Sequence, residues 1–283
     1  MSIASQEGHT AALKLLLENG GDANQANKHG ITPVYTASRN GHTAAIKLLL
    51  ENGGDANQAD ITGATTVYVA SMNGHTAVLK LLLENRGDVN RANNEGCTPL
   101  YMASQEGQTE VVRILLKHGA DASQAANNGT LPVWLASQNG HTEVLHMLLK
   151  AGANARTASF QGFTTLHVAA GKGHLPVVRI LAESWPLDRR PWRTFLLGGG
   201  ASSEQREYQA YQAQQQPADP APRNHLPRLY SKPDMMKEVW TFLHKPRYVN
   251  LDQLDGHGRT ALEVAERYGK GEVAMLLQEL SLG

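Results

Sequence analysis

The chain has 283 residues with equal numbers of acidic and basic side chains, so its formal net charge at pH 7 is zero. This balance argues against a strongly basic nucleic-acid binder, and no run approaches the roughly 18 apolar residues that span a bilayer. The single cysteine, Cys97, excludes an intrachain disulfide and fits a reducing compartment. The first residues lack a basic segment followed by an apolar stretch, so no signal peptide is expected.

A Gly-His-Thr tripeptide recurs at a spacing of 33 residues, and this is the strongest pattern in the sequence. It begins at Gly8, Gly41, Gly74 and Gly140, and Gly107 opens a Gly-Gln-Thr variant in the same frame. A period of this size predicts a stacked repeat protein, in which each unit buries its faces against its neighbours. The length is therefore compatible with one elongated array without a single central core.

Each period predicts two short helices and a connecting finger. A threonine such as Thr32, Thr65 or Thr98 is placed to cap the first helix, and several copies follow it with proline. The glycine of the tripeptide ends this helix after about two turns. A second helix with apolar residues at helical spacing follows, as at 111–116. A Gly-Asp-Ala-Asn type of segment then turns into a β-hairpin-like finger that reaches the next unit.

These markers resemble the ankyrin repeat, whose pattern is T-P-L-H-x-A-A, then G-H, then V/L-x-x-L-L. Residues 98–104 (TPLYMAS) and 164–170 (TTLHVAA) are two of the copies that carry the resemblance. The match covers residues 1–183 and returns at 255–280. It implies an all-α ankyrin-repeat solenoid of stacked helix-turn-helix units with β-hairpin-like fingers.

Departures from the pattern predict locally weaker units. Leu131 replaces a capping threonine, which costs about 1 kcal/mol. Arg86 replaces a helix-ending glycine, and a left-handed backbone there would cost a similar amount. The histidine of T-P-L-H remains only as His167. An aromatic residue replaces it in four units, which removes its usual link to the cap threonine: Tyr35, Tyr68, Tyr101 and Trp134.

The N-terminal end of the array is irregular. Ala4 aligns with Ala37, so the first repeat begins inside its first helix and lacks its finger and Thr-Pro cap. Residues 1–185 are expected to be ankyrin repeats, with the first one truncated. Two explanations are fraying of a poorly covered end and a longer native chain, and the second is favoured.

The C-terminal end is also irregular. Trp185 stands where other repeats have a glycine, and residues 186–222 are expected to be an insertion or linker, partly disordered. Residues 223–254 resemble a degenerate repeat, and residues 255–280 carry D-x-x-G-x-T-x-L-x-x-A in frame. We therefore expect 223–283 to form a degenerate repeat plus a C-terminal ankyrin repeat, with the insertion looping out of one continuous solenoid.

Histidine is abundant, but its placement predicts a structural role. Five histidines occupy the Gly-His slot: His9, His42, His75, His141 and His174. In the ankyrin family this imidazole hydrogen-bonds backbone between neighbouring repeats. Layers about 10 Å apart would separate these side chains, whereas zinc ligands lie within about 2.1 Å of one ion. No catalytic residue, metal site or cofactor is expected.

In the ankyrin family, finger tips and the exposed ends of first helices form a concave strip that binds other proteins. The corresponding tip residues here are Lys28, His29, Ile31, Ile61, Thr62, Ala64, Asn94, Glu95, Cys97, Asn127, Asn128, Thr130, Phe160, Gln161 and Phe163. The corresponding first-helix residues are Arg39, Asn40, Met72, Asn73, Gln105, Glu106, Gln138, Asn139, Gly171 and Lys172. The expected exposed apolar anchors are Ile61, Met72, Phe160 and Phe163. For the two phenylalanines, packing against adjacent fingers or under the insertion is the alternative.

The resemblance implies a non-enzymatic protein–protein interaction scaffold that binds a protein partner on this concave face. We expect a cytoplasmic or nuclear monomer with no small-molecule substrate, no membrane insertion and no nucleic-acid partner. The alternative is a targeting arm or fragment of a larger multidomain protein, such as a ubiquitin ligase adaptor, a kinase or a channel subunit. A third possibility is that Asn24, Asn57 and Asn90 are substrates of an asparaginyl hydroxylase.

Overall fold

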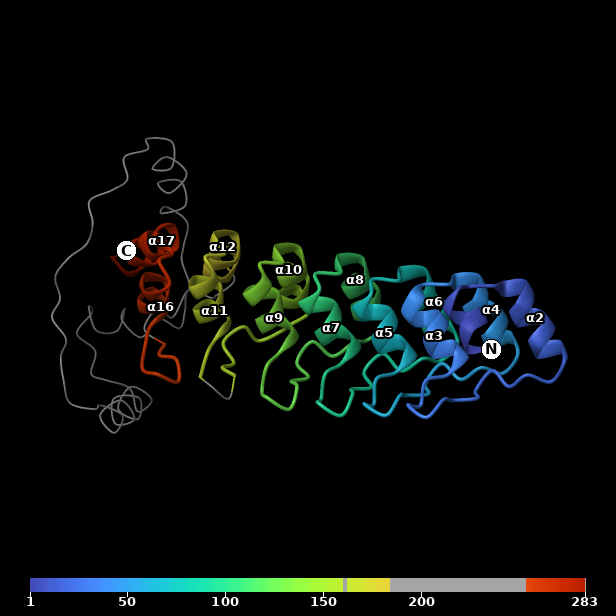
Figure 1. The fold of residues 1–283 in the computed structure, drawn as a ribbon. Coiled ribbons are helices and arrows are strands. Elements are labelled where there is room, and N and C mark those ends of the chain that lie inside the picture. Colours follow the sequence, from blue (N-terminus) through green and yellow to red (C-terminus); the bar gives the residue numbers. More distant parts are fainter. Residues whose placement is uncertain (160–161, 184–252, 283) are drawn as a thin grey trace.

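The computed structural model describes residues 1–159, 162–183 and 253–282, which form seven layers of paired helices (Figure 1). The first helices of the layers are α1 (Ser2–Gln6), α3 (Pro33–Asn40), α5 (Thr66–Met72), α7 (Pro99–Gln105), α9 (Pro132–Asn139), α11 (Thr165–Lys172) and α16 (Ala261–Arg267). The second helices are α2 (Thr10–Glu18), α4 (Thr43–Glu51), α6 (Thr76–Glu84), α8 (Thr109–Lys117), α10 (Thr142–Lys150), α12 (Leu175–Glu183) and α17 (Gly271–Leu282). The described residues contain one isolated bridge, Ala59 to Thr65, and no other extended pairing, so the expected all-α solenoid is confirmed.

The expected caps begin the first helices. Thr32 Oγ1 accepts a hydrogen bond from the backbone N–H of Tyr35 at 3.1 Å, which satisfies one free amide of the first turn. Thr65 and Thr98 cap α5 and α7 in the same way. Leu131 provides no such bond at the start of α9, as its side chain predicts.

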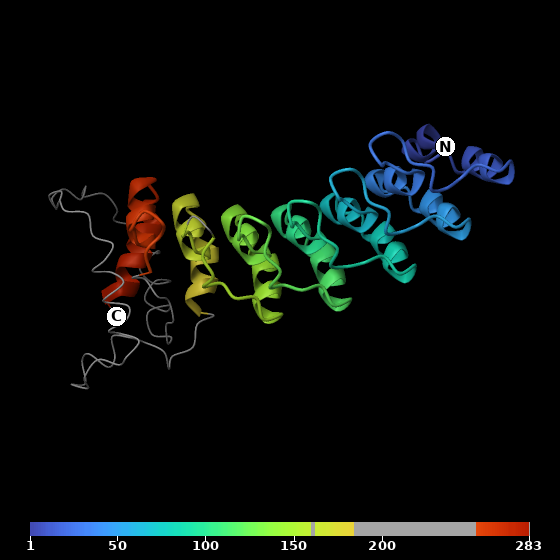
Figure 2. The ribbon, with the colours of Figure 1, turned by 90° about the horizontal axis from the view of Figure 1, so that it is seen from below.

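The core is a row of layers without a single centre. One leucine position of the second helix is fully buried in five successive layers: Leu49, Leu82, Leu115, Leu148 and Leu181. These leucines belong to one continuous cluster, and successive second helices from α2 to α12 pack on one another. Figure 2 shows the layers following one another in a curved row. Stability therefore depends on contacts between neighbours.

Histidines of the Gly-His slot join the layers, as expected. His42 Nε2 lies 2.7 Å from the carbonyl oxygen of Gln6, and His75 Nε2 lies 3.0 Å from that of Arg39. A carbonyl can only accept, so the Nε2–H donates in each pair. These histidines also explain the glycine of the tripeptide. The His75 ring lies against Gly41 of the layer before it, and a Cβ at Gly41 would lie 2.6 Å from that ring.

The last layer follows the layer of α11 and α12 directly, although it is distant in sequence. Helix α16 packs on α11, and α17 contacts α12. The expected insertion at 186–222 and the expected degenerate repeat at 223–254 lie outside the described residues, apart from Gln253 and Leu254. The direct contact leaves no layer between α11 and α16.

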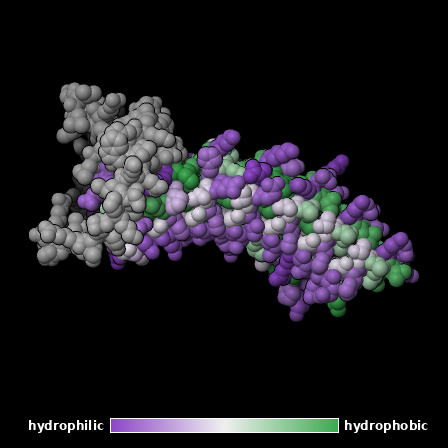
Figure 3. All heavy atoms as spheres, turned by 90° about the horizontal axis from the view of Figure 1, so that it is seen from above, coloured by the Kyte–Doolittle hydropathy of each residue, from purple (hydrophilic) through white to green (hydrophobic). Residues whose placement is uncertain are grey.

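The first layer exposes apolar side chains. Ile3, Leu15 and Leu16 are 77%, 60% and 41% exposed, whereas Leu49, one period after Leu16, is fully buried. Figure 3 shows hydrophobic surface among hydrophilic side chains at this end of the array. The first layer therefore lacks the burial that stabilises later ones.

We expect hydrogen exchange to begin at this end. Layers with one neighbour open more easily than layers with two, because the array is quasi-one-dimensional. Amides within residues 1–25 should be the least protected and those around 100–150 the best protected, as measured by mass spectrometry on the full chain. Uniform protection from end to end would contradict this expectation.

We also expect Arg86→Gly to stabilise the protein. Arg86 has a φ of 64° and is the one non-glycine residue with positive φ among those described, while its equivalent Gly53 has a φ of 79°. Relief of this backbone strain should raise the free energy of unfolding by about 1 kcal/mol in chemical denaturation. The matched change Gly53→Arg should lower the free energy of unfolding by a similar amount. No atom obstructs a side chain at Gly53, so the change adds backbone strain without a steric clash. An unchanged or lowered stability in Arg86→Gly would show that the arginine side chain compensates for the strain.

Candidate protein-binding surface

The fingers are joined to one another by their backbones. The N–H of Ile61 donates to the carbonyl oxygen of His29 at 3.0 Å. Asn94 donates to Thr62 and Asn127 to Glu95, each at 2.9 Å. These bonds fix the spacing of neighbouring tips along one edge of the array, where the fingers hang below the first helices (Figure 1).

The fingers before α3, α5 and α7 also share a pair of side-chain hydrogen bonds that closes the turn. Asn27 Oδ1 accepts from the N–H groups of His29 and Ile31, at 2.9 and 3.1 Å. Asp60 and Asn93 make the equivalent pair of bonds in the next two fingers. Such Asx turns hold the tip backbone in one conformation. The side chains that project from the tips of these three fingers and of the fourth are exposed: Lys28, His29, Ile61, Thr62, Asn94, Glu95, Asn127 and Asn128.

The ends of the first helices supply the second row. Its exposed residues are Arg39, Asn40, Asn73, Glu106, Asn139 and Lys172, and its half-buried residues are Met72, Gln105, Gln138 and Gly171. Histidines of the following layer hold the backbone of this row: His75 bonds to the carbonyl oxygen of Arg39, His141 to that of Gln105 and His174 to that of Gln138. The row is therefore anchored by its backbone while its side chains remain accessible.

The structure corrects the expectation for the third residue of each tip. Ala64, Cys97 and Thr130 are buried, and Ile31 is half-buried. They point inward because the turn directs them under the finger, onto a cluster built around the aromatic residues of the first helices. Met72 is also half-buried and packs on this cluster, so it is not the fully exposed anchor that its position suggested.

The aromatic residues that replace the histidine of the pattern reach the next finger. The Tyr35 hydroxyl donates to Asp60 Oδ2 at 3.0 Å, and Trp134 Nε1–H donates to the carbonyl oxygen of Phe163 at 3.1 Å. The Tyr101 hydroxyl lies 2.9 Å from Thr130 Oγ1. Burial is the main cause that raises the pKa of Tyr68 to about 12. These side chains therefore stay neutral at physiological pH and stabilise the fingers from beneath.

Phe163 is not a free anchor either. Its ring meets that of His167 edge-on, with centroids 6.4 Å apart, and lies 5.8 Å from the ring of His257 on the last finger. The side chain is half-buried. Phe160 and Gln161 lie outside the described residues.

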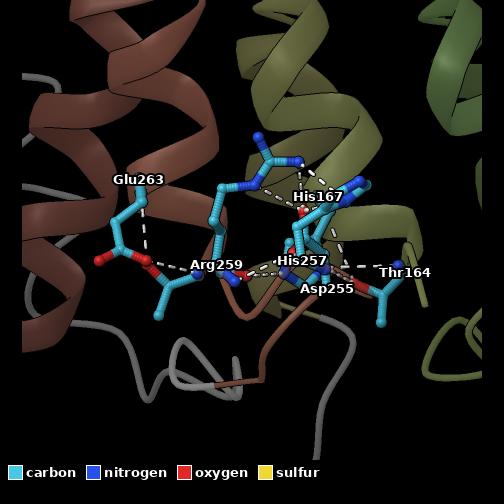
Figure 4. A network of polar contacts seen from close by, with 7 residues as sticks. Thr164, His167, Asp255, His257, Arg259 and Glu263 are labelled. Atoms are coloured by element: carbon cyan, nitrogen blue, oxygen red, sulfur yellow. Dashed lines mark hydrogen bonds and ion pairs between the residues drawn. The ribbon is translucent and has the colours of Figure 1, made fainter. Parts of the chain in front are cut away.

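Figure 4 shows a polar network that joins the last finger to α11. His167 is buried, with Nδ1 2.7 Å from Thr164 Oγ1 and Nε2 3.0 Å from the carbonyl oxygen of Arg259. The Arg259 guanidinium donates twice to Asp255 Oδ2, at 3.0 and 2.8 Å. Burial alone would raise the pKa of the Asp255 carboxyl, but hydrogen bonds from Arg259 and His257 outweigh it and lower that pKa.

The asparagines of the Gly-Asp-x-Asn turns are engaged in bonds between layers. Asn57 Nδ2 donates to the carbonyl oxygen of Arg86 at 2.8 Å, and its Oδ1 accepts from the N–H of Asp88 at 2.7 Å. Asn24 and Asn90 make the same pair of bonds. A hydroxylase would therefore have to reach asparagine side chains whose Nδ2 and Oδ1 atoms both already make hydrogen bonds.

In the described ranges, the histidine, cysteine, aspartate and glutamate side chains form no group of three that could hold a metal ion. None of the described helices is long and apolar enough to cross a membrane.

Docking of the last layer should weaken as pH falls. Burial lowers the pKa of His167, so the folded state disfavours the protonated imidazole. The neutral His167 imidazole therefore stabilises the folded last layer at pH values above its unfolded pKa of about 6.5. This stabilisation is lost as the pH falls through the folded pKa. Hydrogen exchange of α16 amides, corrected for intrinsic rates and compared with α6, should show less protection at pH 5.5 than at pH 7.5. His167→Asn should remove most of this difference, and an unchanged difference would contradict the assignment to His167.

The comparison with known families agrees with this geometry. A model described as ankyrin repeats (3 copies) matches residues 1–93, 53–126 and 119–189, which together cover about two thirds of the chain. A search of curated proteins finds no match. Ankyrin repeats are protein–protein interaction modules. With its paired helices, capping threonines, interlayer histidines and fingers, the chain belongs to the ankyrin-repeat family.

Proposed function

We propose that this protein is a non-enzymatic scaffold that binds a protein partner on the strip, meaning the exposed tip residues and first-helix ends described above. The proposal rests mainly on the exposure of the apolar side chain of Ile61. This side chain is 64% exposed on a tip whose backbone is bonded to the neighbouring fingers. An apolar residue held in this way is typical of an interface anchor, because little conformational freedom remains to be lost on binding.

The proposal includes a monomer in the cytoplasm or nucleus, which the single buried cysteine fits. The alternative remains a targeting arm of a larger protein. The exposed Leu15 and Leu16 favour it, since in the next layer Leu48 is half-buried and Leu49 is fully buried. Immunodetection of the native polypeptide separates the two, because the alternative requires a mass well above that of 283 residues.

We expect Ile61→Ala to weaken partner binding by about 1 kcal/mol or more without changing stability. The partner is first captured with the full chain and identified by mass spectrometry, and its affinity is then measured by calorimetry. Lys47→Ala and Lys80→Ala, on exposed positions of the second helices, should stay within about 0.5 kcal/mol of the parent. Loss of binding in the lysine variants alone would place the interface on the second helices.

Thermal unfolding distinguishes an anchor from a core residue. Ile61→Ala should unfold near the parent temperature, because its side chain makes little contact with the fold. Phe163→Ala should unfold earlier, because it removes the contacts with His167 and His257. If Ile61→Ala unfolds as early as Phe163→Ala, Ile61 stabilises the fold and does not serve as a free anchor.

A further inference from the structure

The charge of the strip changes sign along the array. Lys28 and Arg39 lie beside α3, Glu95 and Glu106 lie beside α7, and Lys172 lies at the end of α11. All five side chains are exposed. Glu7, at the end of α1, is an exposed acidic residue. From the layer of α3 onward the strip is basic, then apolar, then acidic, and finally basic again beyond a neutral stretch of amides.

Two further residues complete this order. Ile61 provides the apolar position between the first basic pair and the acidic pair. Arg267, at the end of α16, is exposed and extends the second basic region to the last layer.

These charges make no ion pairs within the described fold, although Glu106 Oε1 accepts a hydrogen bond from Gln105 Nε2 at 2.9 Å. None of Lys28, Arg39, Glu95, Glu106, Lys172 and Arg267 forms an ion pair with another described residue. Charges on the second helices behave differently, since Arg113 bridges Glu110 at 3.1 Å and Glu143 at 3.3 Å. The strip charges are thus available to a partner, whereas some of those on the opposite face neutralise one another.

The regions of opposite sign are far enough apart to act separately. Packed helix layers lie about 10 Å apart, which exceeds the Debye length of about 8 Å at physiological salt. A partner charge that faces one region is therefore largely screened from the next. A polyanion such as a nucleic acid would meet Glu95 and Glu106 midway and be repelled there.

We propose that the strip binds an extended peptide segment of matching charge order. An acidic side chain faces Lys28 and Arg39, an apolar one faces Ile61, a basic one faces Glu95 and Glu106, and an acidic one faces the second basic region. An extended chain advances about 3.3 Å per residue, so one layer corresponds to about three residues and the whole segment to about fifteen. This inference rests on the proposed function and specifies the partner for the same surface.

The test uses the full chain and fluorescently labelled synthetic peptides. One peptide carries the acidic–apolar–basic–acidic order at these spacings, and a second has the same composition with the basic group moved to one end and both acidic groups in the middle. In fluorescence anisotropy the ordered peptide should bind at least tenfold more tightly, with an affinity that falls as salt rises. Equal affinities, absence of binding by both, or tighter binding of a single-stranded oligonucleotide would overturn the inference.

A charge reversal on the protein provides the matched control. Glu95→Lys with Glu106→Lys should abolish the preference, because each peptide would then present two acidic groups and one basic group to basic regions only. Glu51→Lys with Glu84→Lys makes the same change at exposed positions of α4 and α6 and should leave the preference unchanged. If the captured partner depends on Ile61 but the peptides show no order preference, the proposed function stands and this inference fails.

Discussion

The whole structure depends on the bonds that side chains of one layer make to the backbone of the next. A two-helix layer cannot bury its own faces, so each layer needs its neighbour in a fixed register. Two residue types on different parts of the unit set that register. His75 binds the carbonyl oxygen of Arg39, while Asn57 binds the carbonyl oxygen of Arg86 and the N–H of Asp88. Both act on backbone, so the stack does not depend on surface side chains.

This division lets the strip vary without loss of the fold. The carbonyl oxygen of Arg39 is held by a histidine, while its guanidinium is exposed to solvent. In the same way, Asp60 locks its own finger and accepts from Tyr35, which leaves Ile61 free to project. Side chains presented on an ordered backbone lose little freedom on binding, which is the condition for a selective interface.

The repeating features of the fold could be predicted from the sequence, because each has a local cause. The capping role of Thr32, the missing cap at Leu131 and the left-handed backbone at Arg86 all follow from single residues in a known register. The histidine links followed from the family resemblance. The exposed tips, such as Lys28, were placed by the same register.

Features that depend on tertiary geometry could not be predicted. The inward direction of Cys97 depends on the rotation of the finger about its Asx turn, which no spacing reveals. The contact of Phe163 with His257, and the bond from His167 to Arg259, join residues more than ninety positions apart. No periodicity connects residues separated by so long an interruption of the pattern.

The most direct test of the account is a hydrogen-exchange map of the full chain with and without its captured partner. Binding should slow exchange at the ends of the first helices and at the finger tips, 28–31, 61–64, 94–97 and 127–130. Exchange in the second helices α4, α6 and α8 should not change. Slower exchange confined to those second helices, with unchanged fingers, would contradict the claim that the strip is the binding surface.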